Sequence, residues 1–305
     1  MRIVSLLPGA TEVVAALGLV DNLVGVSHEC DFPESIKDKP VMVRSIIEPD
    51  ASSSVEIDAE VKAAAGTHQS LYRLDDESFH RAQPDLIITQ ELCQVCAVTP
   101  SDLQRALYTL PQLPKLLTLN PSRLDDILTD VERIGESIGK LLEAQQLTAR
   151  LRSRLVTIQE QVAEAAHRPT VACLEWLDPL YAAGHWVPEM VQLAGGVPIL
   201  GEPGVPSRRV TPEELHAAAP DVVVLMPCGF SIDRTRRELP SLTEARWWRQ
   251  LPAIRHRRVF VVDATSYFSR PGPRLIEGVG ILAALCHPDR FGNVMPSGAI
   301  AIMET

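Results

Sequence analysis

The chain repeats one short pattern in its two halves, at residues 77–90 and 213–226. Each copy reads as a helix that ends before a Pro-Asp turn and is followed by an apolar strand, Leu86–Thr89 in the first copy and Val222–Leu225 in the second. Proline disfavours a helical conformation in the residue before it, which explains why both helices stop there. Two copies in corresponding places predict a molecule built from two similar halves.

Short aliphatic runs alternate with helical patterns along the whole chain, beginning with a strand that includes residues 3–7 and a helix that ends at Gly18. Strands that alternate with helices predict α/β layers with mainly parallel sheets. For the first helix, Thr11 is the predicted N-terminal cap and Glu12 is predicted to lie in the first turn, where the helix dipole favours an acid.

A long amphipathic region covers residues 123–167, with apolar side chains three and four residues apart. Ser122 with Asp125 is a plausible N-terminal cap, and Gly135 with Gly139 predicts a break. The helix after the break has about 24 residues and would reach about 36 Å at the helical rise. That length is enough to connect one half of the molecule with the other.

We therefore predict an α/β fold with two Rossmann-like three-layer lobes joined by a single long backbone helix. The expected segments are an N-terminal lobe over residues 1–122, a helical region over 123–168 that includes the inter-lobe helix, and a C-terminal lobe over 169–305.

Charge and hydropathy argue against nucleic acid and membranes as binding partners. The chain carries 29 Lys and Arg against 39 Asp and Glu, with no basic stretch, so a nucleic-acid partner is not expected. No apolar run approaches the roughly 18 residues of a membrane span, so membrane insertion is not expected either. The first residues have the pattern of a buried strand and not that of a secretory signal peptide. This predicts a cytoplasmic protein, or a periplasmic one if a signal peptide has been removed.

Four cysteines fall in loops that follow predicted strands, where ligands bind in open α/β sheets. Cys93 and Cys96 form a C-x-x-C pair, Cys228 occupies the matching loop of the second half, and Cys30 follows another strand. Together they could hold an iron–sulfur cluster or zinc, with His28 as an alternative ligand. Inert buried thiols and a redox pair are the other interpretations, and Cys173 and Cys286 are predicted to lie in the core.

Aromatic side chains gather in the predicted loops of the second half, among them a strand-to-helix loop at residues 175–188, which suits a large planar ligand such as a corrinoid or haem. Polar groups nearby could orient its edge, and His185 could also ligate a metal centre. Arg274 and Glu277, three residues apart on the last helix, suggest a local ion pair. The predicted ligand-binding residues are Pro8, Ala10, Glu175, Trp176, Tyr181, His185, Trp186, Phe230, Tyr267 and Arg270.

Four local signatures accompany this organisation: residues 5–12, the Pro-Asp repeat, Pro188–Met190 leading to Gly195-Gly196, and Pro271–Leu275. In these features the chain resembles the helical-backbone (class III) substrate-binding proteins of ABC importers, and among them it looks most like the cobalamin-binding proteins. The resemblance implies a non-catalytic protein with a rigid ligand cleft between the lobes and an ABC importer permease as partner.

In that family, acidic surface residues engage the permease, and Glu48 and Glu202 are possible analogues. The leading hypothesis is therefore a protein that binds cobalamin or another small-molecule metal chelate. The alternative is a cytoplasmic metal or iron–sulfur protein that uses the loop cysteines. A thiol-dependent enzyme, with Cys or His beside Glu91 or Glu175, is the third hypothesis, and the common hydrolase, P-loop and metalloprotease motifs are absent from the sequence.

Overall fold

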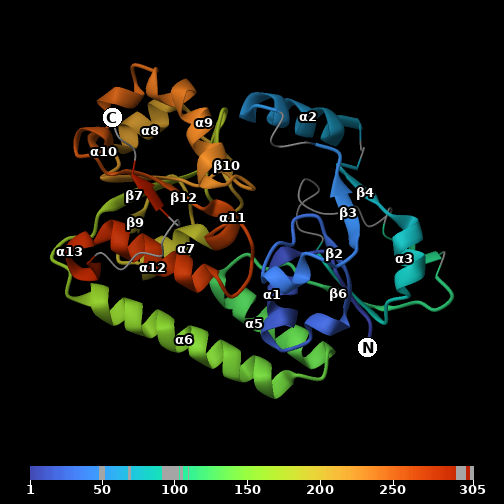
Figure 1. Ribbon diagram of the computed structural model, residues 1–305. Helices are drawn as coiled ribbons and strands as arrows, with labels where there is room; N and C mark the ends of the chain where they lie inside the picture. The colour runs from blue at the N-terminus through green and yellow to red at the C-terminus, as the bar shows by residue number, and fades with distance from the viewer. Residues whose placement is uncertain are drawn as a thin grey trace.

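The computed structural model describes residues 1–47, 52–67, 70–90, 103, 106–108, 110–292 and 300–302. It shows two α/β lobes side by side, with the long helix α6 (Leu141–Ala163) running beneath both of them (Figure 1). Each lobe is a sheet covered by helices on both faces, which confirms the predicted fold class. Among the described residues, no helix combines the length and the apolar character that a membrane crossing requires.

The N-terminal lobe contains a six-stranded sheet in the order β4-β3-β2-β1-β5-β6, parallel except for the β3–β4 pair. Helices α1 (Pro8–Ala16) and α5 (Leu124–Ser137) pack on one face, and α3 (Asp76–Ala82) packs on the other. Helix α2 (Ser54–Thr67) follows β3. The strands are β1 Ile3–Ser5, β2 Leu23–Ser27, β3 Val41–Ser45, β4 Tyr72–Leu74, β5 Leu86–Thr89 and β6 Lys115–Thr118.

The C-terminal lobe contains a seven-stranded sheet in the order β10-β8-β7-β11-β12-β13, with β9 also beside β7. Its strands are β7 Thr170–Leu177, β8 Leu180–Ala182, β9 Val197–Pro198, β10 Arg208–Arg209, β11 Val222–Leu225, β12 Val259–Val262 and β13 Ile300–Ile302. Helices α7 (Val187–Leu193) and α12 (Leu275–Cys286) cover the face toward α6. The remaining helices are α8 Pro212–Ala218, α9 Ile232–Thr243, α10 Pro252–Arg255, α11 Ala264–Tyr267 and α13 Pro288–Phe291.

The two Pro-Asp turns have the same structural role in the two lobes. The Asp85 carboxylate accepts a hydrogen bond from the backbone N–H of Arg2 at 2.7 Å, just before β1. The Asp221 carboxylate accepts one from the backbone N–H of Thr170 at 2.8 Å, at the start of β7. Each aspartate therefore ties the central strand of its lobe to the parallel neighbour, which supports the duplication inferred from the sequence.

Helix α6 joins the two hydrophobic cores, as its apolar spacing predicts. Ala144 and Leu147 belong to the core of the N-terminal lobe, and Leu155 and Ile158 belong to that of the C-terminal lobe. Leu151, between these pairs, packs against both cores. The helix has 23 residues, so it spans about 35 Å. Because one rigid element takes part in both cores, it fixes the lobes along this side.

Two predicted helix caps are wrong. Helix α1 begins at Pro8, four residues earlier than a cap at Thr11 implies, so Thr11 is buried inside the helix and its hydroxyl lies 3.0 Å from the Leu7 carbonyl oxygen. At α5 the capping carboxylate belongs to Asp126 rather than Asp125, because Asp126 accepts hydrogen bonds from the backbone N–H groups of Ser122 and Arg123, both at 2.9 Å.

The segment 175–188 is also not the strand-to-helix loop that the sequence predicts. Strand β7 continues to Leu177, turns at Asp178-Pro179 and returns as the antiparallel strand β8. The aromatic residues of this segment are thereby distributed over a hairpin and the start of α7.

Candidate functional site between the lobes

The two lobes meet where the loops after β1 and β2 contact the segment after β12. Gly9, at the start of α1, lies so close to the Pro271 carbonyl that a Cβ atom there would overlap it. This backbone contact requires glycine and forms the floor of the inter-lobe region, on the side of α5 and α6. The site is therefore built on the carboxyl ends of the strands, as ligand sites in open α/β sheets usually are.

Charged side chains of opposite sign connect the lobes above this floor. Arg274, at the start of α12, donates to both carboxylate oxygens of Glu12 in α1, and its Nε lies 3.0 Å from Glu12 Oε2. Arg270 pairs with Asp31, and its other terminal nitrogen lies 3.5 Å from Glu29 Oε2. The Glu12 and Arg274 side chains are only 5% and 14% exposed, so this pair is shielded from water. In the second pair Arg270 is buried, whereas Asp31 is 50% exposed.

This arrangement corrects two predictions. Among the described residues, Arg274 forms salt bridges with Glu12 and Asp31 of the other lobe, in place of the predicted local pair with Glu277. Glu12 lies in the fifth position of α1, beyond the first turn, so it serves the lobe contact and not the helix dipole. Burial raises the pKa of Glu12, and the hydrogen bond from Arg274 opposes this rise.

Aromatic rings flank the Arg274 guanidinium. Its centre lies 4.4 Å from the ring centroid of Phe32 in the N-terminal lobe and 6.0 Å from that of Tyr267 in the C-terminal lobe. Burial raises the pKa of Tyr267, so its phenol is neutral at physiological pH. Of the predicted site residues, Arg270 thus contacts the other lobe at this point and Tyr267 lies beside Arg274 of its own lobe. Phe32 is a neighbour that sequence reasoning missed.

Trp176 and Phe230 form a second contact between the lobes. Their ring centroids are 5.2 Å apart, and both rings pack in a cluster with Ile57 of α2 and Leu71. Phe230 is 1% exposed. The Trp176 indole N–H donates to the Ser54 carbonyl at 3.2 Å. In this state, both predicted ligand-binding rings contact the opposite lobe.

The remaining predicted ligand residues are dispersed. Tyr181 lies opposite Trp176 on the β7–β8 hairpin, and Glu175, half-buried, is on β7. Trp186 packs against the core of the C-terminal lobe and donates its indole N–H to the Phe268 carbonyl at 2.8 Å. His185 stacks on Trp186, and burial lowers the pKa of His185.

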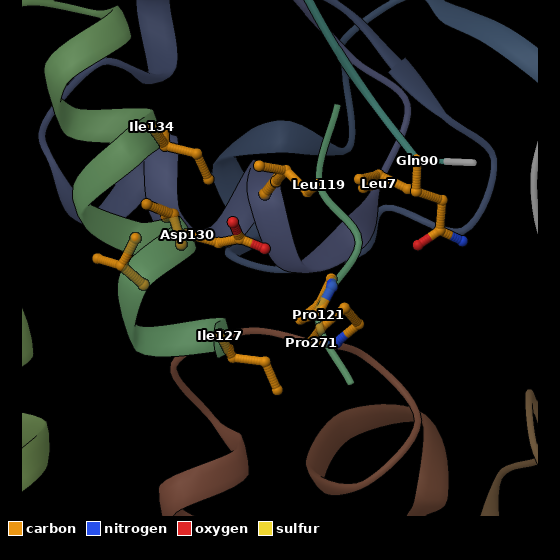
Figure 2. A pocket seen from close by; sticks show the side chains of 11 residues that line it. Leu7, Gln90, Leu119, Pro121, Ile127, Asp130, Ile134 and Pro271 are labelled. Carbon is orange, nitrogen blue, oxygen red and sulfur yellow. The ribbon is translucent and has the colours of Figure 1, made fainter. Parts of the chain in front are cut away.

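Ala10 lies at the floor, where α1 and the loop before α5 meet Pro271 (Figure 2). Pro8 is the first residue of α1, next to Gly9. Ala10 lines a cavity of about 10 Å³, which has room for about one water molecule. The Asp130 carboxylate of α5 points into this cavity, and burial raises its pKa. A cavity of this size belongs to the packing of the floor and does not hold a large ligand.

The described residues do not support the predicted metal site, since none of them form a group of three His, Cys, Asp or Glu side chains suited to a metal ion. Both ring nitrogens of His28 face the backbone of the neighbouring strand: Nδ1 lies 3.1 Å from the Val43 carbonyl, and Nε2 accepts from the Ser45 N–H at 3.4 Å. The Cys30 thiol is buried 3.1 Å from the Thr11 hydroxyl, and burial raises its pKa, which disfavours the thiolate that a metal needs.

Among the described residues, the other cysteines add no ligand to this group. Cys228 is exposed after β11, and Cys93 and Cys96 lie outside the described residues. Cys173 and Cys286 are buried in the core of the C-terminal lobe, as predicted, and burial raises the pKa of Cys286 to about 12.

Comparison with known proteins agrees with this architecture. Residues 3–265 match the family described as "Periplasmic binding protein". An uncharacterized ABC transporter substrate-binding lipoprotein of Bacillus subtilis is 25% identical over 95% of this chain and 81% of its own length. A vitamin B12-binding protein of Vibrio cholerae is 26% identical over 91% of this chain and 86% of its own length.

Solved structures share the fold. A periplasmic haem-binding protein from Pseudomonas aeruginosa superposes with a TM-score of 0.75 at 21% identity, covering 100% of this chain and 98% of its own. The periplasmic vitamin B12-binding protein of Vibrio cholerae gives a TM-score of 0.67 at 22% identity, covering 94% and 96%.

The predicted cytoplasmic location is wrong. The matched family is one of periplasmic proteins, the Bacillus relative is a lipoprotein, and both structural neighbours are periplasmic. The prediction relied on the first residues alone, whereas the similarity extends over nearly the whole chain. On the match over residues 3–265, this chain belongs to the periplasmic binding protein family.

Proposed function

We propose that this protein is the non-catalytic ligand-binding component of an ABC importer, and that it holds a cobalamin-like ligand between its lobes. Relatives that are 26% identical over about nine-tenths of the chain are vitamin B12-binding proteins, which supports this ligand class. The segments that meet between the lobes carry the groups such a ligand needs, with the Tyr267 and Phe32 rings beside the polar side chains of Arg270 and Asp31.

The pairing of the inter-lobe arginines is the observation that favours a corrinoid over haem. Arg270 and Arg274 each contact a carboxylate of the other lobe, so their charge is already balanced. The two propionates of haem would have to displace Asp31 or Glu12, and the displaced carboxylate would lose its charge-assisted hydrogen bonds. The amide-bearing rim of a corrin ring places no carboxylate near these pairs.

Titration of the purified protein with cyanocobalamin, followed by tryptophan fluorescence and by the visible spectrum, tests this proposal. We expect saturable 1:1 binding at micromolar concentration or below, with haemin bound at least about tenfold more weakly, which corresponds to about 1.4 kcal/mol. The absence of any spectral change with cobalamin at micromolar concentration would contradict the proposal, and tighter binding of haemin would reassign the ligand.

The importer permease is the proposed partner. Glu202, one of the two acidic residues assigned to this contact by analogy, is exposed on the C-terminal lobe, whereas Glu48 lies outside the described residues.

A further inference from the structure

Helices α2 and α9 connect the lobes on the side opposite α6 (Figure 1). The connection centres on Ser54, the first residue of α2, which is fully buried. Its hydroxyl donates to Glu238 Oε2 of α9 at 3.0 Å, and its backbone N–H lies 3.5 Å from the same oxygen. The carboxylate of one lobe thereby caps the positively polarised end of a helix in the other lobe.

Arg234 of α9 strengthens the same contact. One of its terminal nitrogens, Nη2, lies 2.6 Å from Glu238 Oε1 and donates to the Ser52 carbonyl at 2.6 Å. The guanidinium also lies over the Phe230 ring, 4.5 Å from its centroid. With the Trp176 N–H on the Ser54 carbonyl, four side chains hold the N-terminal end of α2. We call these four residues, Trp176, Phe230, Arg234 and Glu238, the clasp.

The position of the clasp determines what it can control. On the α6 side the lobes are fixed by the shared helix and by the Gly9–Pro271 contact. A large ligand that lies between the loops after β2 and β12 cannot enter through this fixed side. The α2–α9 side consists of hydrogen bonds and a small apolar cluster, which can separate without breaking the core of either lobe.

We propose that the clasp is a gate: release of α2 from α9 admits the ligand, and re-formation of the Glu238–Ser54 and Trp176–Ser54 hydrogen bonds retains it. This departs from the rigid cleft that the family resemblance implies. The ligand-dependent part rests on the proposed function, whereas the contacts of the clasp do not.

The substitution Glu238→Gln tests the gate, because it keeps the size of the side chain and removes the charge that caps α2. Hydrogen exchange in the ligand-free protein should become about tenfold faster at the amides of residues 54–57, since a hydrogen bond to a charged group is lost. Glu244→Gln, at the exposed end of α9, is the matched control and should leave this exchange unchanged. Trp176→Phe removes the hydrogen bond to Ser54 together with part of the ring that packs on Phe230, and it should act in the same direction.

Stopped-flow mixing with cyanocobalamin then distinguishes a gate from a merely structural contact. In Glu238→Gln, both the association and the dissociation rates should rise, by up to about tenfold, relative to the Glu244→Gln control. Unchanged exchange in α2 would overturn the clasp, and faster exchange with unchanged association would overturn the gate. If cobalamin binds to no variant and not to the wild type, the proposed function fails, while the exchange experiment still decides whether the clasp exists.

Discussion

The substitution Ser153→Pro should lower the free energy of unfolding by about 3 kcal/mol, although residue 153 is exposed and no buried side chain is lost. Position 153 lies in the middle of α6, between Leu151, which contacts both cores, and Leu155, which belongs to the C-terminal one. Proline removes a backbone hydrogen bond there and breaks the helix at the point where it passes from one lobe to the other. Ligand affinity should fall as well, because the lobes lose their fixed relation.

Urea unfolding followed by circular dichroism measures the loss, and Ser153→Ala is the matched control. Alanine is a slightly better helix former than serine, so the control should be neutral or stabilised by up to about 0.5 kcal/mol. If the proline and alanine variants have the same free energy of unfolding, an unbroken α6 does not contribute to stability. That result would contradict the claim that the shared helix stabilises the arrangement of the two lobes.

The substitution Glu12→Ala should also cost about 3 kcal/mol, at the low end of the range for a buried ion pair that loses one partner. Arg274 would stay largely buried between Phe32 and Tyr267, with Asp31 at 3.9 Å as its nearest remaining carboxylate. Thermal and urea unfolding of the variant measure the effect.

Two comparisons identify the cause of that loss. Glu34→Ala removes a carboxylate that is 84% exposed and pairs with Lys37, and it should change stability by less than about 0.5 kcal/mol. The double variant E12L/R274M leaves no buried charge and should recover most of the loss. A Glu12→Ala protein as stable as Glu34→Ala would mean that the charge pairs above the floor do not hold the lobes together.

Local patterns in the sequence predict much of this fold. The spacing of Leu147, Leu151 and Leu155 determines one face of a helix, and that face is what both cores bury. The Pro-Asp turns predict the duplication because they too are local signals: proline restricts the backbone conformation of the residue before it, independently of the rest of the chain. Such signals depend on neighbours within a few residues, so they can be read without coordinates.

The contacts between the lobes could not be predicted in the same way. Arg274 forms its ion pair with Glu12, 262 residues away in the sequence, and not with Glu277 on its own helix. The clasp joins Ser54 to Glu238 across 184 residues. Neither pair carries a local motif, because their meeting depends on how two separately folded lobes are positioned by α6. The aromatic residues of the second half do not form one group either, because the β7–β8 turn places Trp176 and Trp186 in different surroundings.

The central claim is that both lobes contribute to one ligand site. Hydrogen exchange measured by mass spectrometry, with and without cyanocobalamin, tests it most directly. The account predicts slower exchange in the bound protein at residues 27–31 of the N-terminal lobe and, in the same experiment, at residues 263–270 of the C-terminal lobe. Protection confined to one lobe, or to surfaces away from both segments, would contradict it.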